Sequence, residues 1–292
     1  MIKPSNHLSP KPGKPGQSDG LSRRSILLAG AAVTTSVLTP LLARATVQGG
    51  SRRTALVIGN ADYLDAPLSN PVNDARLVAE TLREIGFEVG LLENGTLSQM
   101  LDGVRQWMVR STDAEVRAFY FAGHGTQYQG QNFLVPVDLS ITTESQIKRS
   151  AMHLSDVVQS LSAQEMGVNF VIVDACRTDP TVFLDRAGSR TRGLGDDLEA
   201  GFAPEEAPRG TMVAYSTSPG SLAADGAGSR NSIFTQALAS QLRRPGIPVE
   251  SLFKRVRISV MRATRNAQVP WERSSLVGDF CFLPDAKGRC GN

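Results

Sequence analysis

The stretch FYFAGHGTQ, residues 119–127, joins an apolar run to a histidine that stands between two glycines. Among the residues after position 45, His124 is one of only two histidines. A short apolar run bounded by glycine is typical of a buried strand. We expect this strand to end near Ala122 and to present the His124 imidazole, with glycines that allow tight turning and close approach of a substrate.

Other apolar runs follow the same pattern, and VNFVIV at 168–173 ends in Asp174-Ala175-Cys176. The predicted strands cover 54–60, 87–92, 116–122, 168–173, 211–216 and 280–283, with a hairpin arm at 132–137. The predicted helices cover 72–85, 97–109, 154–161, 233–242 and 252–263. Strands that alternate with helices favour parallel pairing, with helices on both faces of the sheet. The sequence therefore predicts an α/β fold with a mostly parallel, six-stranded sheet.

His124 and Cys176 both fall at the predicted carboxyl ends of strands, where open parallel sheets bind ligands. A thiol becomes a useful nucleophile near neutral pH when a base or cation lies beside it, and an imidazole on a neighbouring strand supplies one. The alternative is structural: a histidine bonded to a nearby carbonyl and an inert buried thiol. Metal chemistry is disfavoured because the chain has no CxxC, no HExxH and no Cys/His cluster at ligand spacing.

The first 45 residues have the features of an export signal. Residues 1–20 are rich in Pro, Gly, Ser and Lys and read as disordered. Ser22-Arg23-Arg24-Ser25-Ile26-Leu27 resembles a twin-arginine motif, and the apolar stretch 26–42 is short for a membrane span. Small residues at Ala43-Arg44-Ala45 suit cleavage. We expect export by the twin-arginine machinery to the periplasm, cleavage near Ala45 and no stable membrane anchor, although a buried helix or retained anchor is the alternative.

Removing these residues changes the charge of the chain. Six of the 31 basic residues and one of the 28 acidic residues lie in 1–45, so residues 46–292 carry 25 basic and 27 acidic residues, a net charge of −2. No basic patch remains to suggest a nucleic-acid partner. The remaining length suits one sizeable domain at 46–292.

Three cysteines remain in that domain, Cys176, Cys281 and Cys290. In an oxidising compartment an odd number suggests one pair and one free thiol. Cys281 and Cys290 flank FLPDAKGR, which has a proline and a glycine for turning, so we predict that they pair. Two reduced thiols are the alternative because the sequence fixes no geometry.

Four blocks in order, ALVIGNADY (55–63), NDA (73–75), YFAGHG (120–125) and VDACR (173–177), resemble the caspase-like cysteine peptidases of clan CD, peptidase family C14. The spacing of histidine and cysteine is similar to that of the caspase signature. The chain is most similar to the bacterial metacaspase-like, or orthocaspase, branch, over roughly residues 53–283. The resemblance implies a three-layer α/β/α sandwich and proteolysis by a Cys-His dyad.

The resemblance also implies roles for individual residues. Cys176 would be the nucleophile, His124 would protonate the leaving amine, and the backbone N–H groups of Gly125 and Cys176 would form the oxyanion hole. Asp74 and Asp174 match the acids that line the specificity pocket of metacaspases, which favours substrates with Arg or Lys before the scissile bond. Read from the residues alone, Asp74 is equally a first-turn helix acid and Asp174 a polar strand end.

The chain departs from the family pattern in places. Ala122 stands where metacaspases often have serine, and Arg177-Thr178-Asp179-Pro180 replaces a common His-Ser-Gly. The calcium-binding acids of several metacaspases have no counterpart there, so we expect no cofactor. The long loop 177–210 contains Arg177, Arg186, Arg190, Arg192 and Arg209, which a basic-specific enzyme could cut in itself. A solvated loop that is never cut is the alternative.

Three functions fit these observations. The first is an exported cysteine endopeptidase that acts on proteins or peptides with basic residues. The second is a catalytically weak caspase-like module that binds peptides or partners. The third is a cysteine hydrolase of another bond, such as an amide in a cell-wall peptide.

Overall fold

The computed structural model describes residues 52–64, 66–140, 143–164, 166–177, 202–218 and 229–291, all within the unit Ala43–Asn292. Its strands are β1 (Arg53–Gly59), β2 (Glu88–Glu93), β3 (Val116–Tyr128), β4 (Gln131–Leu134), β5 (Met152–His153), β6 (Val168–Arg177), β7 (Thr211–Tyr215) and β8 (Trp271–Ser274). Its helices are α1 (Pro71–Glu84), α2 (Leu97–Arg110), a 3-10 turn at Glu144–Gln146, α3 (Ile147–Ser150), α4 (Leu154–Ser162), α5 (Ile233–Leu242) and α6 (Val249–Ala263).

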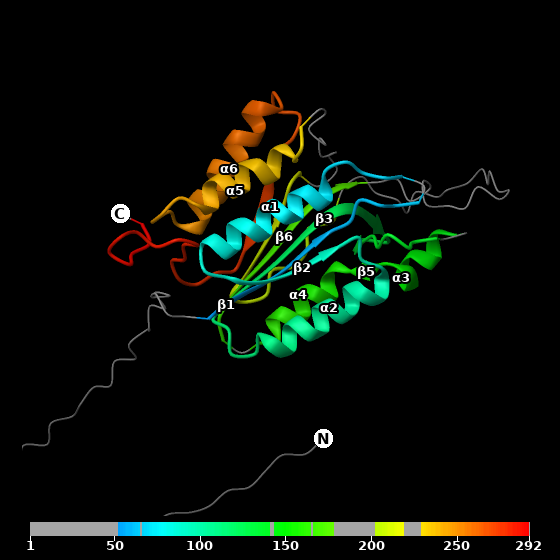
Figure 1. Cartoon of the computed structure of the whole chain (residues 1–292), viewed down its shortest axis with the longest axis horizontal. Coiled ribbons are helices and arrows are strands. Elements are labelled where there is room, and N and C mark those ends of the chain that lie inside the picture. The colour runs from blue at the N-terminus through cyan, green and yellow to red at the C-terminus, as the bar shows by residue number, and fades with distance from the viewer. Residues whose placement is uncertain are drawn as a thin grey trace, which may run out of the picture. The chain divides into compact units, whose positions relative to one another are not determined.

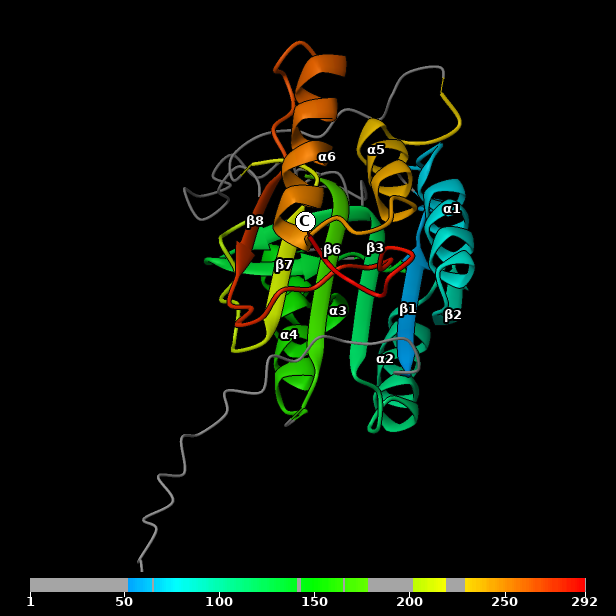
Figure 2. The same ribbon diagram turned by 90° about the vertical axis from the view of Figure 1, so that its left-hand side faces the viewer.

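The core of the sheet has the strand order β2-β1-β3-β6-β7-β8. All neighbours pair in parallel except β8, which runs antiparallel to β7 at one edge. Figure 2 shows β8, β7, β6, β3 and β1 following one another across the view. A small antiparallel extension is added by β4, which pairs with β3 and with β5. The prediction of a mostly parallel six-stranded sheet is confirmed.

Helices cover both faces of this sheet because its buried strands are apolar on both sides. In β1, Ala55 and Val57 face the cluster formed with α1, α5 and α6, whereas Leu56 and Ile58 face the cluster formed with α2 and α4. This alternation is the period of two expected for a strand. Figure 1 shows α1, α5 and α6 on one side of the strands and α2 and α4 on the other.

The strand β3 does not end at Ala122, as the sequence suggested, but runs on to Tyr128. Its first part pairs in parallel with β1 as far as Ala122 and with β6 as far as Gly125. From Gly125 onward it pairs antiparallel with β4. His124 therefore lies where the strand passes from the parallel sheet into a hairpin. The preceding residue, Gly123, has a φ of +153°, a conformation that glycine tolerates.

The predicted strand at 280–283 is wrong. Phe280 and Phe282 are buried, with ring centroids 4.8 and 4.7 Å from that of Phe170, but they pair with no strand in the described part of the chain. The sheet ends instead at β8, which carries Glu272 and Arg273 and therefore lacks the apolar run that marks a buried strand. Charged side chains are typical of an edge strand, which explains why apolarity alone missed it.

The C-terminal segment closes against the start of the domain. The Arg53 guanidinium donates a hydrogen bond to the carbonyl of Phe282 at 2.7 Å, across 229 residues of sequence. Cys281 and Cys290 form a disulfide with Cα atoms 5.5 Å apart. Between them, Asp285 accepts hydrogen bonds from the backbone N–H groups of Arg289 and Lys287, both at 2.8 Å, and these lower the pKa of its carboxyl.

Candidate active site

The two predicted catalytic residues lie opposite each other. His124 on β3 is the ladder partner of Cys176 on β6, whose backbone the structure describes. Neighbouring strands are about 4.8 Å apart, so the two backbones are adjacent although 52 positions separate them in the sequence. The sheet therefore brings together a histidine and a cysteine at its carboxyl edge, as the pattern of strand ends predicted.

The His124 ring is buried, with 4% of the residue exposed, and is held in a defined orientation. Its Nε2 lies 2.7 Å from the carbonyl oxygen of Ala66. A carbonyl oxygen only accepts hydrogen bonds, so Nε2 carries a proton in this contact. The neutral imidazole is then the Nε2–H tautomer, and Nδ1 is the ring nitrogen at which a proton is taken up or given away.

Tyr63 holds the same histidine from the end of β1. Its hydroxyl accepts the backbone N–H of His124 at 2.9 Å and donates to the carbonyl of Val135 at 3.1 Å. Its ring lies against the imidazole, with centroids 4.4 Å apart. Burial raises the pKa of Tyr63 well above its ordinary value, so the hydroxyl stays protonated and remains a donor. Sequence reasoning missed this residue.

Asp74 and Asp174 converge on the first residues of α5. Asp74, in the first turn of α1, accepts hydrogen bonds at 2.9 Å from the backbone N–H of Ser232 and from the Asn231 side chain. Asp174, on β6, accepts hydrogen bonds from the hydroxyl of Ser232 and, at 2.8 Å, from that of Thr235. The predicted pair of acids therefore meets at one residue, Ser232, whose N–H bonds Asp74 and whose hydroxyl bonds Asp174.

This arrangement places two buried carboxylates, 2% and 8% exposed, at a helix N-terminus. Ser232 also caps α5, because its hydroxyl accepts the backbone N–H of Thr235 at 3.0 Å. Negative charge is stabilised at such a terminus. Tyr120 extends the network by donating to the Thr235 hydroxyl, and burial, together with the charges of Asp174 and Asp74, raises the pKa of Tyr120 well above its ordinary value.

Gly125, the predicted oxyanion residue, packs against a residue that the sequence did not single out. A Cβ built on Gly125 would lie 2.2 Å from the ring of Phe202, so only glycine fits beneath this ring. The adjoining Ala203 is fixed by the Asn132 side chain, which accepts its N–H at 2.7 Å and donates to its carbonyl at 2.9 Å. The isolated phenylalanine in the polar stretch FAPEEAPRG was the available signal.

A serine beside the acids has an unpaired hydroxyl. Ser216 directly follows β7, and its N–H donates to the carbonyl of Val173 at 2.9 Å, so it lies next to Asp174 across the strands. Its Oγ is buried and has no hydrogen-bond partner among the residues that the structure describes. Buried hydroxyls without partners are uncommon in native proteins and call for an explanation, such as a ligand that supplies the missing partner.

The predicted long loop lies mostly outside the described residues. The loop predicted at 177–210 is described only at Arg177 and from Phe202 onward, and four of its five arginine side chains fall outside the described part. Among the side chains that the structure does describe, no group of three or more His, Cys, Asp or Glu residues is placed to hold a metal ion.

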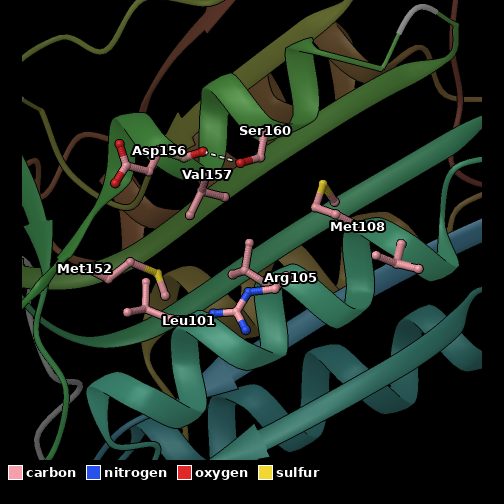
Figure 3. Close-up of a pocket in the computed structure, with 9 residues that line it drawn as sticks. Leu101, Arg105, Met108, Met152, Asp156, Val157 and Ser160 are labelled. Atoms are coloured by element: carbon pink, nitrogen blue, oxygen red, sulfur yellow. Dashed lines mark hydrogen bonds between the residues drawn. The ribbon is translucent and has the colours of Figure 1, made fainter.

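A separate groove of about 510 Å³ opens between α2 and α4, on the face of the sheet opposite α1 and α5 (Figure 3). Apolar side chains from both helices line it, with Arg105 and Asp156 among them. None of His124, Asp74, Asp174 or Gly125 borders this groove. The groove is therefore not the site at which these residues meet.

Comparison with known proteins identifies similarity to proteins with a caspase domain. The family model for the caspase domain, Peptidase_C14, matches residues 52–281. The Homo sapiens mucosa-associated lymphoid tissue lymphoma translocation protein 1 and its Mus musculus homologue are each 29% identical over 126 residues, 43% of this chain and only 15% of the relative. A solved structure of pro-sf-caspase-1 superimposes with a TM-score of 0.57 at 19% identity, covering 81% of this chain and 92% of that one.

Proposed function

We propose, from the premise that this chain belongs to the caspase family, that it is an active cysteine endopeptidase that cleaves after arginine or lysine. The observation that carries the proposal is the ladder pairing of His124 with Cys176 at the carboxyl edge of the sheet. Family membership supports a peptidase domain, and the meeting of Asp74 and Asp174 supports the basic specificity.

The proposed chemistry follows from the positions of these groups. The Cys176 thiol gives its proton to Nδ1 of His124, and the resulting thiolate attacks the carbonyl carbon of the scissile bond. The N–H groups of Gly125 and Cys176 stabilise the negative oxygen that forms. His124 gives a proton from Nδ1 to the leaving amine, while Ala66 holds Nε2. Water then hydrolyses the thioester and returns the thiol.

The proposed specificity rests on charge. A guanidinium or ammonium group entering beside Asp74 and Asp174 would form charge-assisted hydrogen bonds, which are stronger than neutral ones. The unpaired Ser216 hydroxyl adds a neutral acceptor next to Asp174. A carboxylate in the same place would meet two like charges, so cleavage after aspartate is disfavoured.

We also propose that the chain belongs to the bacterial metacaspase-like branch and is exported to the periplasm by the twin-arginine machinery. The paired Arg23-Arg24 motif and the order of sequence blocks support this. In the part of the chain that the structure describes, no helix is long and apolar enough to span a bilayer. Self-cleavage at an arginine of the 177–210 loop belongs to the same proposal.

The decisive experiment compares hydrolysis of fluorogenic peptides ending in Arg, Lys or Asp by the chain without residues 1–45 and by its Cys176→Ala variant. Cleavage after Arg or Lys that the variant lacks supports the whole proposal. Cleavage after Asp would overturn the specificity and keep the peptidase. No cleavage of any peptide, with or without calcium and reductant, would favour the peptide-binding module, and cleavage of small amides alone would favour a hydrolase of another bond.

A further inference from the structure

We infer that Tyr63 is a positioning residue for the histidine of the proposed peptidase, holding the His124 peptide through its hydroxyl. This inference rests on the proposed function, in which His124 transfers a proton. The hydroxyl of Tyr63 is the acceptor for the backbone N–H of His124, at 2.9 Å. The position of His124 in the ladder is therefore also fixed by a side chain from the segment that follows β1.

The Tyr63 hydroxyl is itself held in place by Val135, which also contacts His124. Its hydroxyl donates to the carbonyl of Val135 at 3.1 Å, and the N–H of Val135 donates to the carbonyl of His124 at 3.0 Å. Tyr63 and Val135 therefore hold the N–H and the C=O of one residue, His124. A rotation of the His124 peptide breaks one of these contacts.

Asn60 anchors the same arrangement to the sheet. Its backbone N–H donates to the carbonyl of Ala122 at 2.9 Å, and its side-chain amide donates to the carbonyl of Val135 at 3.1 Å. Asn60 is fully buried, and Tyr63 is 4% exposed. The end of β1 thus supplies both residues that fix the segment around His124.

Gly123 shows how closely the tyrosine approaches the strand. A Cβ built at this position would lie 2.5 Å from the Tyr63 hydroxyl oxygen, and the φ of +153° suits only glycine. The first glycine of the Gly-His-Gly sequence therefore makes room for Tyr63. Its neighbour Gly125 makes room for Phe202 in the same way.

The test is Tyr63→Phe, which keeps the ring beside the imidazole and removes the hydroxyl. We expect kcat for an arginyl peptide to fall between about ten- and a hundredfold with KM within about twofold, because small misplacement of a catalytic group costs that much. Tyr128→Phe is the matched control, since Tyr128 is a second tyrosine buried in the same apolar cluster.

A second readout separates this inference from the proposed function. Cys176 is the one cysteine outside the disulfide, so the rate of its alkylation by iodoacetamide reports on the thiolate directly. We expect Tyr63→Phe to slow alkylation at least severalfold relative to Tyr128→Phe. An unchanged kcat, or an unchanged alkylation rate if the parent chain cleaves no peptide, would overturn the inference.

Discussion

His124 lies directly opposite Cys176 in the parallel ladder between β3 and β6. The strand β3 leaves the parallel sheet one residue later, at Gly125, and turns into the hairpin with β4. The histidine thus occupies the next-to-last position at which the two central strands pair. A catalytic pair placed there is fixed by the most extensively paired strands of the sheet and still lies at its edge.

Replacing either member of this pair should abolish peptide cleavage. We expect Cys176→Ala to reduce hydrolysis of an arginyl peptide to the uncatalysed background, because the nucleophile is lost. His124→Ala should lower kcat by about 10²- to 10⁴-fold, the usual contribution of general acid–base catalysis. Steady-state kinetics and thermal unfolding of both variants provide the measurement. Activity of His124→Ala within tenfold of the parent chain would contradict the dyad.

The acidic pair should control which residue precedes the cleaved bond. Asp74→Asn and Asp174→Asn keep the size of each side chain and remove one charge, so we expect kcat/KM for arginyl peptides to fall at least tenfold in each. Asp156→Asn is the matched control, since Asp156 is also a first-turn acid but lies exposed on α4. Equal effects of Asp74→Asn and Asp156→Asn on kcat/KM would show that Asp74 only stabilises the N-terminus of its helix.

Removing the unpaired hydroxyl of Ser216 should leave the protein as stable or more stable but weaken its binding of substrate. Ser216→Ala removes a buried polar atom that has no partner, so the free energy of unfolding should stay the same or rise by up to about 1 kcal/mol. If substrate supplies the missing partner, KM for arginyl peptides should rise about three- to tenfold. Chemical denaturation and steady-state kinetics measure the two effects, and an unchanged KM would remove Ser216 from the pocket.

The disulfide should matter for stability and not for catalysis. Cys290→Ser opens a loop that spans nine residues, and we expect the free energy of unfolding to fall by about 2–3 kcal/mol. Activity at 25 °C should stay within twofold of the parent, because neither cysteine lies near His124 in the described structure. Denaturation without reductant is the measurement, and a large fall in kcat at unchanged stability would contradict it.

Much of the fold could be predicted because the buried strands are recognisable in the sequence as apolar runs. The run at 168–173 and the run before Gly123 are the two central strands, and their order with the helices implied parallel pairing. The edge strand β8 could not be found in this way, since WERS is polar. Phe280 and Phe282 led to the prediction of a strand that does not form, because an apolar segment can be buried in a core without pairing in a sheet.

The candidate site residues that could be predicted are those whose side-chain type suggests a chemical role. The residues that could not be predicted take part only through hydrogen bonds made in the folded chain. His124 and Cys176 stand out at strand ends, and the family pattern pointed to Asp74 and Asp174. Tyr63 and Ser232 are ordinary polar residues in sequence, and their roles arise from hydrogen bonds that cross 61 and 158 residues. No local pattern encodes such contacts, so only the folded chain shows them.

The hydrogen bond from Arg53 to the carbonyl of Phe282 joins the first strand to the segment after the last one. The domain therefore cannot complete its core before Phe282 has been synthesised, because Phe282 closes that core against β1. Contacts of such long sequence separation form slowly, as loop closure must precede them. For a protein proposed to be exported already folded, this sets an order of events: synthesis beyond Phe282, closure of the core around it, and only then passage across the membrane.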